Sequence, residues 1–469
     1  MKIRKLKIVG YKVIDHLDLD FTDANGNTLD TIIFAGLNGC GKTTVLEAIQ
    51  SVLSDGMRNK YRRGNNDHYV FLGKEILIEF DLTNSDFENK FVSILRNGSE
   101  IVDKIISEKL TEDRKYRKEF IQKILASIEK NKTFTLSYKS NGDQELLNND
   151  FEVFNFFFDR VVEFGFNVTY IPYETYMESR HKGKRIFGYS EDDLKDRGSV
   201  LKEIEKKKEQ LFRVIDFDKD KTLVKSYIIN EFLQGIVKHQ DIPPRITMSK
   251  IIDSINEILQ HITLKTTLVE IDTKEIKFKS SNGQIITIDG LSSGEKQLFY
   301  RFVYLQTLEI QNSIIMVDEP ETSLHPTWQQ QLAKLYQSIG VNNQVILATH
   351  SPHILASVKP ENIFLLNVKD SKIEATHLKD TDLKTKGVET NRILKEIMGV
   401  TKLMDEETSA DMIALNQFIE ADTFDKPEAI EIYNRLLANL GKEDSYMVSV
   451  DFEIVMRKKM REKKLKAAV

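Results

Sequence analysis

The chain has very little cysteine, because Cys40 is its single thiol in 469 residues. One cysteine excludes any disulfide within the chain, which fits a reducing compartment such as the cytoplasm. Long apolar runs are also missing. No stretch of about 18 apolar residues occurs, and the beginning of the chain, MKIRKLKIVGY, lacks the apolar segment of a signal peptide. We therefore expect a soluble, cytoplasmic protein without a membrane span of its own.

An excess of charge of one sign is missing as well. The chain has 67 Lys and Arg against 72 Asp and Glu, a formal net charge of −5. Its overall charge therefore gives no indication of nucleic-acid binding. Two local basic clusters remain, at 180–185 and 457–466. Each is either a solvated helix surface or a contact to a partner or to the phosphates of DNA or RNA.

Apolar and charged residues are plentiful, at 41% and 30% of the chain, enough for a sizeable core and two or three domains. Short apolar stretches, TIIFAG, SIIMVDEP, QVILATHS and NIFLLNV, stand among helical patterns. This alternation is typical of an α/β fold with a mostly parallel sheet. Asn282–Gly283 predicts a hairpin turn, PTWQQQLAKLYQSIG predicts one helix, and the last hundred residues predict several short helices.

The first candidate site is a glycine-rich loop, Gly36-Leu-Asn-Gly-Cys-Gly-Lys-Thr43, between a predicted strand and a predicted helix. The spacing G-x-x-x-x-G-K-[ST] is typical of a phosphate-binding loop, in which backbone N–H groups converge on phosphate oxygens at a helix N-terminus. Lys42 then reaches the β- and γ-phosphates, and the Thr43 hydroxyl binds Mg²⁺. A chance glycine-rich turn is the alternative. Within the loop, Lys42 and the helix N-terminus are expected to lower the pKa of the Cys40 thiol.

A second candidate site follows the apolar strand Ile314–Val317. Asp318, at the carboxyl end of that strand, is placed to hold the metal through water. Glu319 is placed to polarise the attacking water as a general base. Acidic residues at a strand end are otherwise common turn formers, so this interpretation depends on the phosphate-binding loop.

The segment Leu291-Ser-Ser-Gly-Glu-Lys-Gln297 resembles the LSGGQ signature of ABC-type ATPases. Ser292 and Glu295 also form the pattern of a capping box for the helix that follows. Both interpretations are compatible, because a serine-capped helix N-terminus is a site for anions. His350, at the end of the next apolar strand, matches the switch histidine of the same superfamily. A lone histidine there is otherwise structural.

Together these motifs resemble the ABC/SMC-like P-loop ATPases, and within them the RecF/OLD-type branch. The resemblance implies ATP and Mg²⁺ as ligands and a homodimer, or higher homo-oligomer, in which the signature binds the γ-phosphate held by the other copy. It implies catalytic roles for Lys42, Glu319 and His350 and metal binding by Thr43 and Asp318. The nucleotide-binding residues that it implies are Gly36, Asn38, Gly39, Cys40, Gly41, Lys42, Thr43, Thr44, Ser292, Ser293 and Gly294.

The resemblance also implies how the chain is divided. We expect an N-terminal lobe of the ATPase head at 1–175, a helical insertion at 176–265, a C-terminal lobe at 266–370, and a helical region for partner or DNA contact at 371–469. No glutamine of the Q-loop kind is identified, although NVTYIPYETYMESR, from 167 on, can serve in its place. Lys12, after the first strand, is a further candidate near the phosphates.

Residues 388–460 are similar to the tail of PtuA-type ATPases, subunits of the Septu and some retron anti-phage systems. That resemblance implies a separate nuclease partner of the HNH type, which the ATPase gates. A RecF-like DNA-repair ATPase that binds DNA directly is the alternative. An OLD-type nuclease would require a Toprim domain after His350, and the sequence beyond it shows no such pattern.

Overall fold

The computed structural model describes residues 2–53, 74–81, 132–139, 168–171, 212–214, 266–271, 275–308, 310–400 and 404–467, with scattered positions between 122 and 260. The chain forms two compact units, Met1–Ile393 and Leu394–Val469, and each is described by itself. Among the described residues no helix is long and apolar enough to cross a membrane. The division into four parts stays a prediction, and its second part, 176–265, lies almost wholly outside the described residues.

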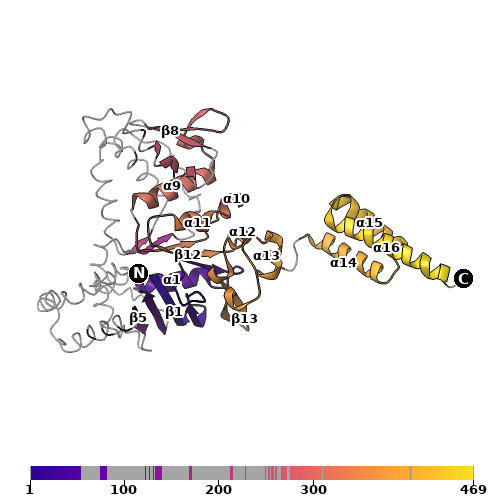
Figure 1. The fold of residues 1–469 in the computed structure, drawn as a ribbon, viewed down its shortest axis with the longest axis horizontal. Coiled ribbons are helices and arrows are strands. Elements are labelled where there is room, and N and C mark those ends of the chain that lie inside the picture. The colour runs from indigo at the N-terminus through magenta and orange to yellow at the C-terminus, as the bar shows by residue number, and fades with distance from the viewer. Residues whose placement is uncertain are drawn as a thin grey trace, which may run out of the picture. The chain divides into compact units, whose positions relative to one another are not determined.

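A seven-stranded sheet with the order β14-β13-β3-β12-β11-β6-β7 lies in the first unit (Figure 1). All neighbouring strands are parallel except the edge pair β13 and β14. The strands are Thr31–Ala35 (β3), Val168–Ile171 (β6), Phe212–Val214 (β7), Ile314–Asp318 (β11), Gln344–Thr349 (β12), Ile363–Lys369 (β13) and Lys372–His377 (β14). The predicted α/β fold with a mostly parallel sheet is confirmed.

Strands β3, β11 and β12 are buried at every residue. Their apolar sequences fit this position, because a parallel strand inside an α/β sheet is covered on both faces. Their carboxyl ends coincide: Ala35 is paired with Thr349, and Asp318 with Ala348. The loops that follow these three strands therefore begin at one edge of the sheet, where ligands bind in open α/β folds.

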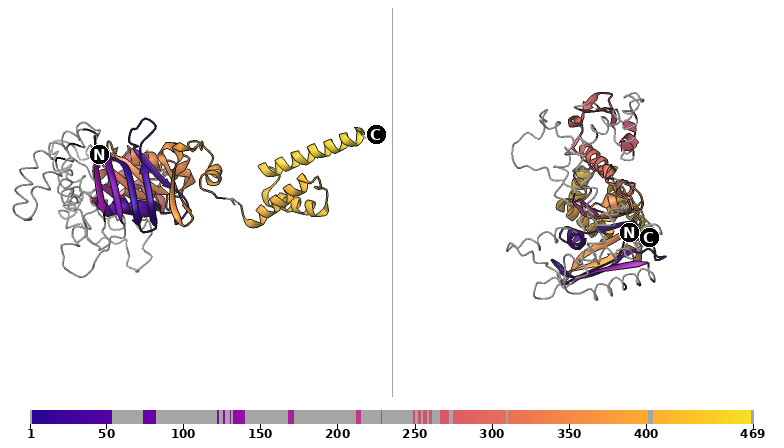
Figure 2. Two further views of the ribbon diagram at one scale, coloured as in Figure 1. Left: turned by 90° about the horizontal axis from the view of Figure 1, so that it is seen from below. Right: turned by 90° about the vertical axis from the view of Figure 1, so that its left-hand side faces the viewer.

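A second, antiparallel sheet has the order β2-β1-β4-β5 and is seen as the indigo and purple strands in Figure 2. Its strands are Lys2–Tyr11 (β1), Ile14–Asp20 (β2), Glu75–Asp81 (β4) and Thr133–Lys139 (β5). Helix α1 (Lys42–Leu53) contacts β4 of this sheet and β11 and β12 of the parallel sheet. Its Val45, Ala48, Ile49 and Val52 are buried, as the helical spacing predicted.

One fully buried amide joins the two sheets. Gln344, at the first position of β12, accepts a hydrogen bond from the backbone N–H of Ile3 (2.7 Å). Its Nε2 donates to the carbonyl oxygens of Ile3 (2.8 Å) and Leu29 (2.9 Å). Because a buried amide without partners is costly, these three bonds fix the first strand of the chain against the start of β12.

The third sheet has the order β10-β9-β8 and precedes helix α9 (Ser293–Thr307). Its strands are Thr267–Ile271 (β8), Ile276–Lys279 (β9) and Ile285–Thr287 (β10). The predicted turn at Asn282–Gly283 is confirmed, since β9 and β10 pair across it. Gly283 has a φ of 84°, and its N–H donates to the Ser280 carbonyl (2.9 Å). Glycine adopts this left-handed conformation without strain.

Two predictions about secondary structure are wrong. The single helix expected over PTWQQQLAKLYQSIG is two short helices, Pro326–Gln329 (α10) and Leu332–Gln337 (α11). The C-terminal region is not wholly helical, because Lys372–His377 forms β14 and pairs with β13. The alternation in KIEATH carried that signal. The other short helices are Pro352–Leu355 (α12) and Thr390–Glu396 (α13), and α13 includes the boundary between the two units. The 3₁₀ turns lie at Ile288–Gly290, Pro360–Asn362 and Leu378–Asp380.

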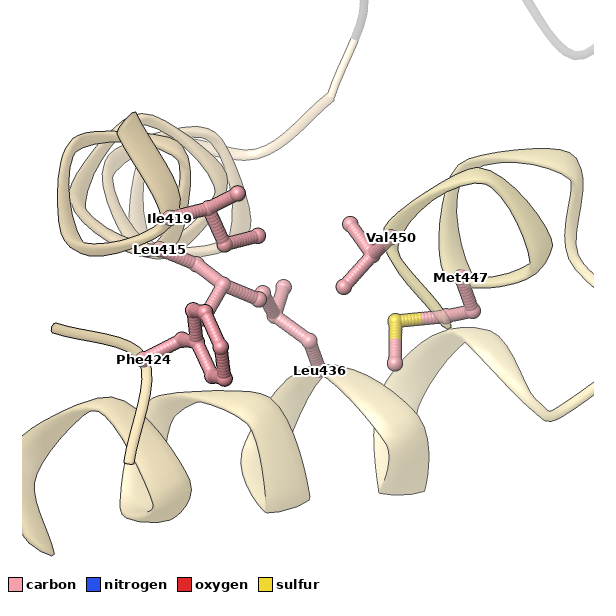
Figure 3. Close-up of a cluster of buried hydrophobic side chains, with 6 residues drawn as sticks. All are labelled: Leu415, Ile419, Phe424, Leu436, Met447 and Val450. Carbon is pink, nitrogen blue, oxygen red and sulfur yellow. The ribbon is translucent and has the colours of Figure 1, made fainter. Parts of the chain in front are cut away.

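From residue 404 on, the described part of the second unit forms three helices, Glu406–Glu420 (α14), Pro427–Leu440 (α15) and Ser445–Ala467 (α16). Buried side chains of these helices and of the turn between α14 and α15 meet in one cluster (Figure 3), formed by Leu415, Ile419, Phe424, Leu436, Met447 and Val450. A bidentate pair between Arg435 and Asp411, with N···O distances of 2.6 and 2.8 Å, joins α15 to α14 beside it. This unit therefore has a small hydrophobic core of its own.

Candidate functional site

The glycine-rich loop joins β3 to α1 in the predicted place. Gly36, Gly39 and Gly41 have φ values of 146°, 80° and 91°, which only glycine adopts readily. A side chain would also collide with neighbours at two of these positions. A Cβ on Gly36 would lie 2.2 Å from the Leu366 carbonyl oxygen, and one on Gly41 would lie 2.5 Å from Cδ1 of Ile373. The loop is therefore supported from behind by the β13–β14 hairpin.

Lys42 is the first residue of α1, and its side chain turns back over the loop. Its ammonium donates to the carbonyl oxygens of Gly36 and Leu37, both at 3.0 Å. This places a buried cation inside the loop. Asn38 and Thr43 are exposed on the solvent side of the same segment, and Thr44 is half-buried. The arrangement can hold a phosphate chain through Lys42 and the N-terminal amides of α1.

The prediction that the pKa of Cys40 is lowered is wrong, because the pKa is raised. The thiol is 2% exposed, and its sulfur lies where a side chain on Gly36 would reach, 2.7 Å from the ideal Cβ. Burial raises the pKa of Cys40, and the nearby charge of Lys42 lowers it by a smaller amount. Desolvation outweighs the cation because the thiolate is the charged form that burial penalises.

Asp318 ends β11 and is 1% exposed. Burial raises the pKa of this carboxyl to about 7; a hydrogen bond from the Thr43 hydroxyl and the charge of Lys42 lower it, and the charges of Glu319 and Glu321 raise it. Within the described part of the chain its Oδ1 is buried without a hydrogen-bond partner. A hydroxyl and a buried carboxylate side by side fit Mg²⁺, which keeps several waters and takes few protein ligands. Asp318 and Thr43 would hold that ion, whose charge would bind the phosphates and orient a water.

Glu319, the residue after Asp318, has an unusual backbone conformation with a φ of 45°. A left-handed conformation at a residue with a long side chain is strained and is frequent at functional sites. It is fixed by a hydrogen bond from its own N–H to the Ala348 carbonyl on the neighbouring strand (2.8 Å). The side chain is 22% exposed. A carboxylate held in this way can accept a proton from a water at the edge of the sheet.

His350 faces Glu319 from the loop after β12. Its Nδ1 lies 3.5 Å from Oε1 of Glu319 and 3.8 Å from Oε1 of Glu321, and its side chain is 43% exposed. The structure thus brings Lys42, Asp318, Glu319 and His350 together at the edge of the parallel sheet where β3, β11 and β12 end. Glu321 was not singled out from the sequence, although it is the third carboxylate of the segment Asp318-Glu-Pro-Glu.

The signature segment begins α9 as a capping box, which confirms the structural interpretation of Ser292 and Glu295. The Ser292 N–H donates to Oε2 of Glu295 (3.0 Å), and the Glu295 N–H donates to the Ser292 hydroxyl (3.3 Å). Ser292 and Ser293 are exposed, whereas Gly294 is buried. A Cβ on Gly294 would lie 2.8 Å from the Trp328 ring and 3.2 Å from the Ser323 carbonyl oxygen. The helix N-terminus is therefore in contact with the segment that follows Glu319.

A second link between α9 and that segment was missed by the sequence analysis. Arg301 is 1% exposed, and its Nη1 donates to the Pro320 carbonyl (2.9 Å) and to the Tyr336 hydroxyl (3.1 Å). Pro320 follows Glu319 directly. The guanidinium therefore holds α9 against the backbone of the segment that follows Asp318 and Glu319. No sequence motif predicts this role of Arg301, because its partners are a backbone carbonyl and a tyrosine hydroxyl that are distant in sequence.

The other candidates from the sequence are Lys12, the segment from 167 on and the two basic clusters. Lys12 has a φ of 50° and forms an ion pair of 2.5 Å with Glu47 of α1. The segment expected to replace the Q-loop continues from β6 beyond the described residues, and the basic cluster at 180–185 also lies outside them. In the basic stretch at 457–466, Arg461 is bonded to Asp422 and Asp425 within the second unit.

A family model described as AAA ATPase domain matches residues 1–355. The chain is similar to Septu protein PtuA of Bacillus thuringiensis, at 23% identity over 450 residues that cover 92% of this chain and 93% of that protein. It is also similar to the Retron Vc95 probable ATPase of Vibrio cholerae serotype O1 biovar El Tor, at 26% identity over 429 residues, covering 80% and 75%. Among solved structures, an SMC head bound to the C-winged helix domain of ScpA covers 81% of this chain and 99% of that one, with 15% identity and a TM-score of 0.44.

Proposed function

Because the chain belongs to the AAA ATPase domain family and is an ATPase, we propose that two copies of it close on ATP and that hydrolysis in the closed pair gates a separate nuclease during anti-phage defence. The family match and the relatives named PtuA and Retron Vc95 probable ATPase confirm the resemblance that the sequence predicted. The residue roles, the dimer and the nuclease partner are parts of the proposal.

One observation supports the hydrolytic roles more than any other. Glu319 is held at a φ of 45°, directly after the buried Asp318 and 3.5 Å from His350. We assign Lys42 to the phosphates, Asp318 and Thr43 to Mg²⁺, and Glu319 to the attacking water. His350, whose Nδ1 lies 3.5 Å from Glu319, is assigned to the γ-phosphate. Each role uses a side chain that the fold holds at the same edge of the sheet.

The shared site is proposed from α9. Ser292 and Ser293 are exposed at the helix N-terminus, where backbone N–H groups and the helix dipole favour a phosphate. We propose that this surface contacts the γ-phosphate bound by the second copy, as in the ATPases that the motif resembles. Gly294, Ser323 and Trp328 support the helix end from behind within one chain.

Two inactive variants test the shared site. Lys42→Ala should not hold ATP, and Ser293→Asp should place a carboxylate against the γ-phosphate. Ser293 suits this test because it is exposed and an acidic side chain in the first turn of a helix is favourable. Gly294 does not suit it, since any side chain there would collide with Trp328 within the same chain.

Each variant alone should lack ATPase activity, and a mixture of the two should regain it through one intact composite site in each mixed dimer. Ser293→Ala, which adds no charge, is the matched control and should remain active. Mixed dimers that form but neither turn over nor close on ATP would contradict the proposal. Adding a purified HNH nuclease subunit, with and without ATP, then tests the gating. The ATPase chain by itself should not cut DNA, and cutting by the pure chain would contradict the separate effector.

A further inference from the structure

Glu321 is a buried carboxylate that none of the roles above uses. It lies three residues after Asp318 in the turn that leaves β11, and it is 6% exposed. Burial raises the pKa of this carboxyl, and hydrogen bonds from Thr349 and His350 oppose the rise. A carboxylate taken out of water is costly unless it is bonded, so its bonding partners show what its position achieves.

The two hydrogen-bond donors to Glu321 are the last residue of β12 and the residue that follows it. Its Oε1 accepts a hydrogen bond from the Thr349 hydroxyl (2.6 Å) and another from the backbone N–H of His350 (2.9 Å). Charge-assisted hydrogen bonds of this length are about twice as strong as neutral ones. The same oxygen therefore fixes the last residue of the strand and the first amide of the loop that carries the imidazole.

The contact belongs to a closed chain of hydrogen bonds. The Thr349 hydroxyl also accepts from the Ser351 N–H (2.9 Å), and the Ser351 hydroxyl donates to Oε1 of Gln329 (2.7 Å). Nε2 of Gln329 donates in turn to the Leu324 carbonyl (2.9 Å). The Leu324 N–H donates to the Glu321 carbonyl (3.0 Å), which closes the chain. The turn after Glu319 thus holds the histidine loop on both sides of His350.

We propose that Glu321 is a positioning residue for His350: by holding the His350 amide, it sets the distance between the imidazole and Glu319. The inference rests on the proposed function, in which His350 and Glu319 act in hydrolysis. The His350 side chain is 43% exposed and its Nδ1 lies 3.5 Å from Oε1 of Glu319, so a shift of the backbone at His350 would change this distance. A displacement of about 1 Å at a reacting group can reduce a rate by about 10²-fold.

The variants Glu321→Ala and Glu321→Gln separate positioning from a general loss of structure. Glu321→Ala removes the acceptor of both hydrogen bonds, and kcat should fall by about 10- to 100-fold. KM for ATP should change by less than about threefold, since Lys42 and the phosphate-binding loop keep their contacts. Glu321→Gln keeps an amide oxygen that can accept both bonds, and it should lose less than about fivefold. Equal losses of kcat in the two variants would contradict positioning through the acceptor.

A double-mutant cycle with His350→Ala supplies a readout that a merely structural role would not change. If Glu321 acts through His350, then Glu321→Ala added to His350→Ala should lower kcat by less than about threefold further, because residues that act as a unit are strongly non-additive. Multiplication of the two losses would overturn the inference while leaving the proposed function intact. If His350→Ala itself keeps the wild-type rate, the role of His350 in the proposed function fails instead.

Thr349 provides the same test without touching the carboxylate, in case Glu321→Ala does not fold. Thr349→Val keeps the shape of the side chain and removes the hydroxyl, whereas Thr349→Ser keeps the hydroxyl. We expect Thr349→Val to lower kcat by about 10-fold with little change in KM, and Thr349→Ser to lower it much less. The loss in Thr349→Val should disappear in a His350→Ala background. Equal activity of the two Thr349 variants, or a loss that persists without His350, would overturn the inference.

Discussion

Replacing Asp318 with Asn should make the protein more stable in magnesium-free buffer at alkaline pH, although it should destroy the proposed metal site. Asp318 is 1% exposed, and burial raises its pKa from the ordinary 3.8 to about 7. The folded protein therefore binds this proton more tightly than the unfolded chain does. The resulting stabilisation is complete below about pH 4 and is lost as the pH rises through about 7.

The magnitude follows from the size of the shift. Each pK unit is worth about 1.4 kcal/mol, so raising the pH from about 5 to about 8 should cost wild type about 3 kcal/mol of unfolding free energy. Asparagine does not titrate, and Asp318→Asn should escape this loss. A unit of nearly 400 residues shifts its melting temperature by roughly 1 °C per kcal/mol, which predicts a difference of about 3 °C.

Calorimetry in EDTA, from about pH 5 to about pH 8, measures the melting temperatures of wild type and Asp318→Asn. The matched control is Asp370→Asn, because Asp370 is an exposed residue of the turn between β13 and β14 and its φ of 48° suits asparagine. The control should follow wild type at every pH. Parallel pH profiles for wild type and Asp318→Asn would refute the reasoning, since they would show that Asp318 does not bind its proton more tightly in the folded state.

Four further outcomes are expected. Glu319→Gln should bind ATP but turn it over about 10²- to 10⁴-fold more slowly, and a wild-type rate would remove Glu319 as the base. Mg²⁺ affinity, measured by titration calorimetry, should fall about tenfold for each pH unit below about 7, because the metal must displace the Asp318 proton; a flat profile would contradict this. Cys40, with its raised pKa and buried sulfur, should react with a thiol reagent far more slowly in the folded chain than in urea, and equal rates would place it outside the core. Leu436→Ala, in the core of the second unit, should destabilise that unit by about 2–5 kcal/mol in urea titrations, and an unchanged midpoint would contradict the packing.

The elements predicted correctly are those whose signals are local. The phosphate-binding loop is defined by glycines within eight residues, and Gly36, Gly39 and Gly41 all have positive φ values. The capping box of Ser292 and Glu295 spans four residues, and the hairpin at Asn282–Gly283 only two. In each case the residues that make the structure are neighbours in the sequence.

The failures at the candidate site involve partners that are distant in sequence. Cys40 is buried because its loop rests on the β13–β14 hairpin, more than 300 residues away, and no local pattern announces that contact. The role of Glu321 depends on the Thr349 hydroxyl and the His350 amide, which reach it only because β11 and β12 are adjacent in the sheet. Predicting such contacts requires the strand order, which apolar stretches alone do not determine.

Trp328 is the single tryptophan of the chain, and its ring lies against the backbone of Gly294 at the start of α9. The imidazole of His325 stands beside it, with ring centroids 6.4 Å apart. The protein therefore carries an intrinsic fluorophore at the helix end proposed to meet the phosphate of the second copy. A shift of that helix would change the polarity around the indole, and its emission would report closure of the pair in real time without any added label.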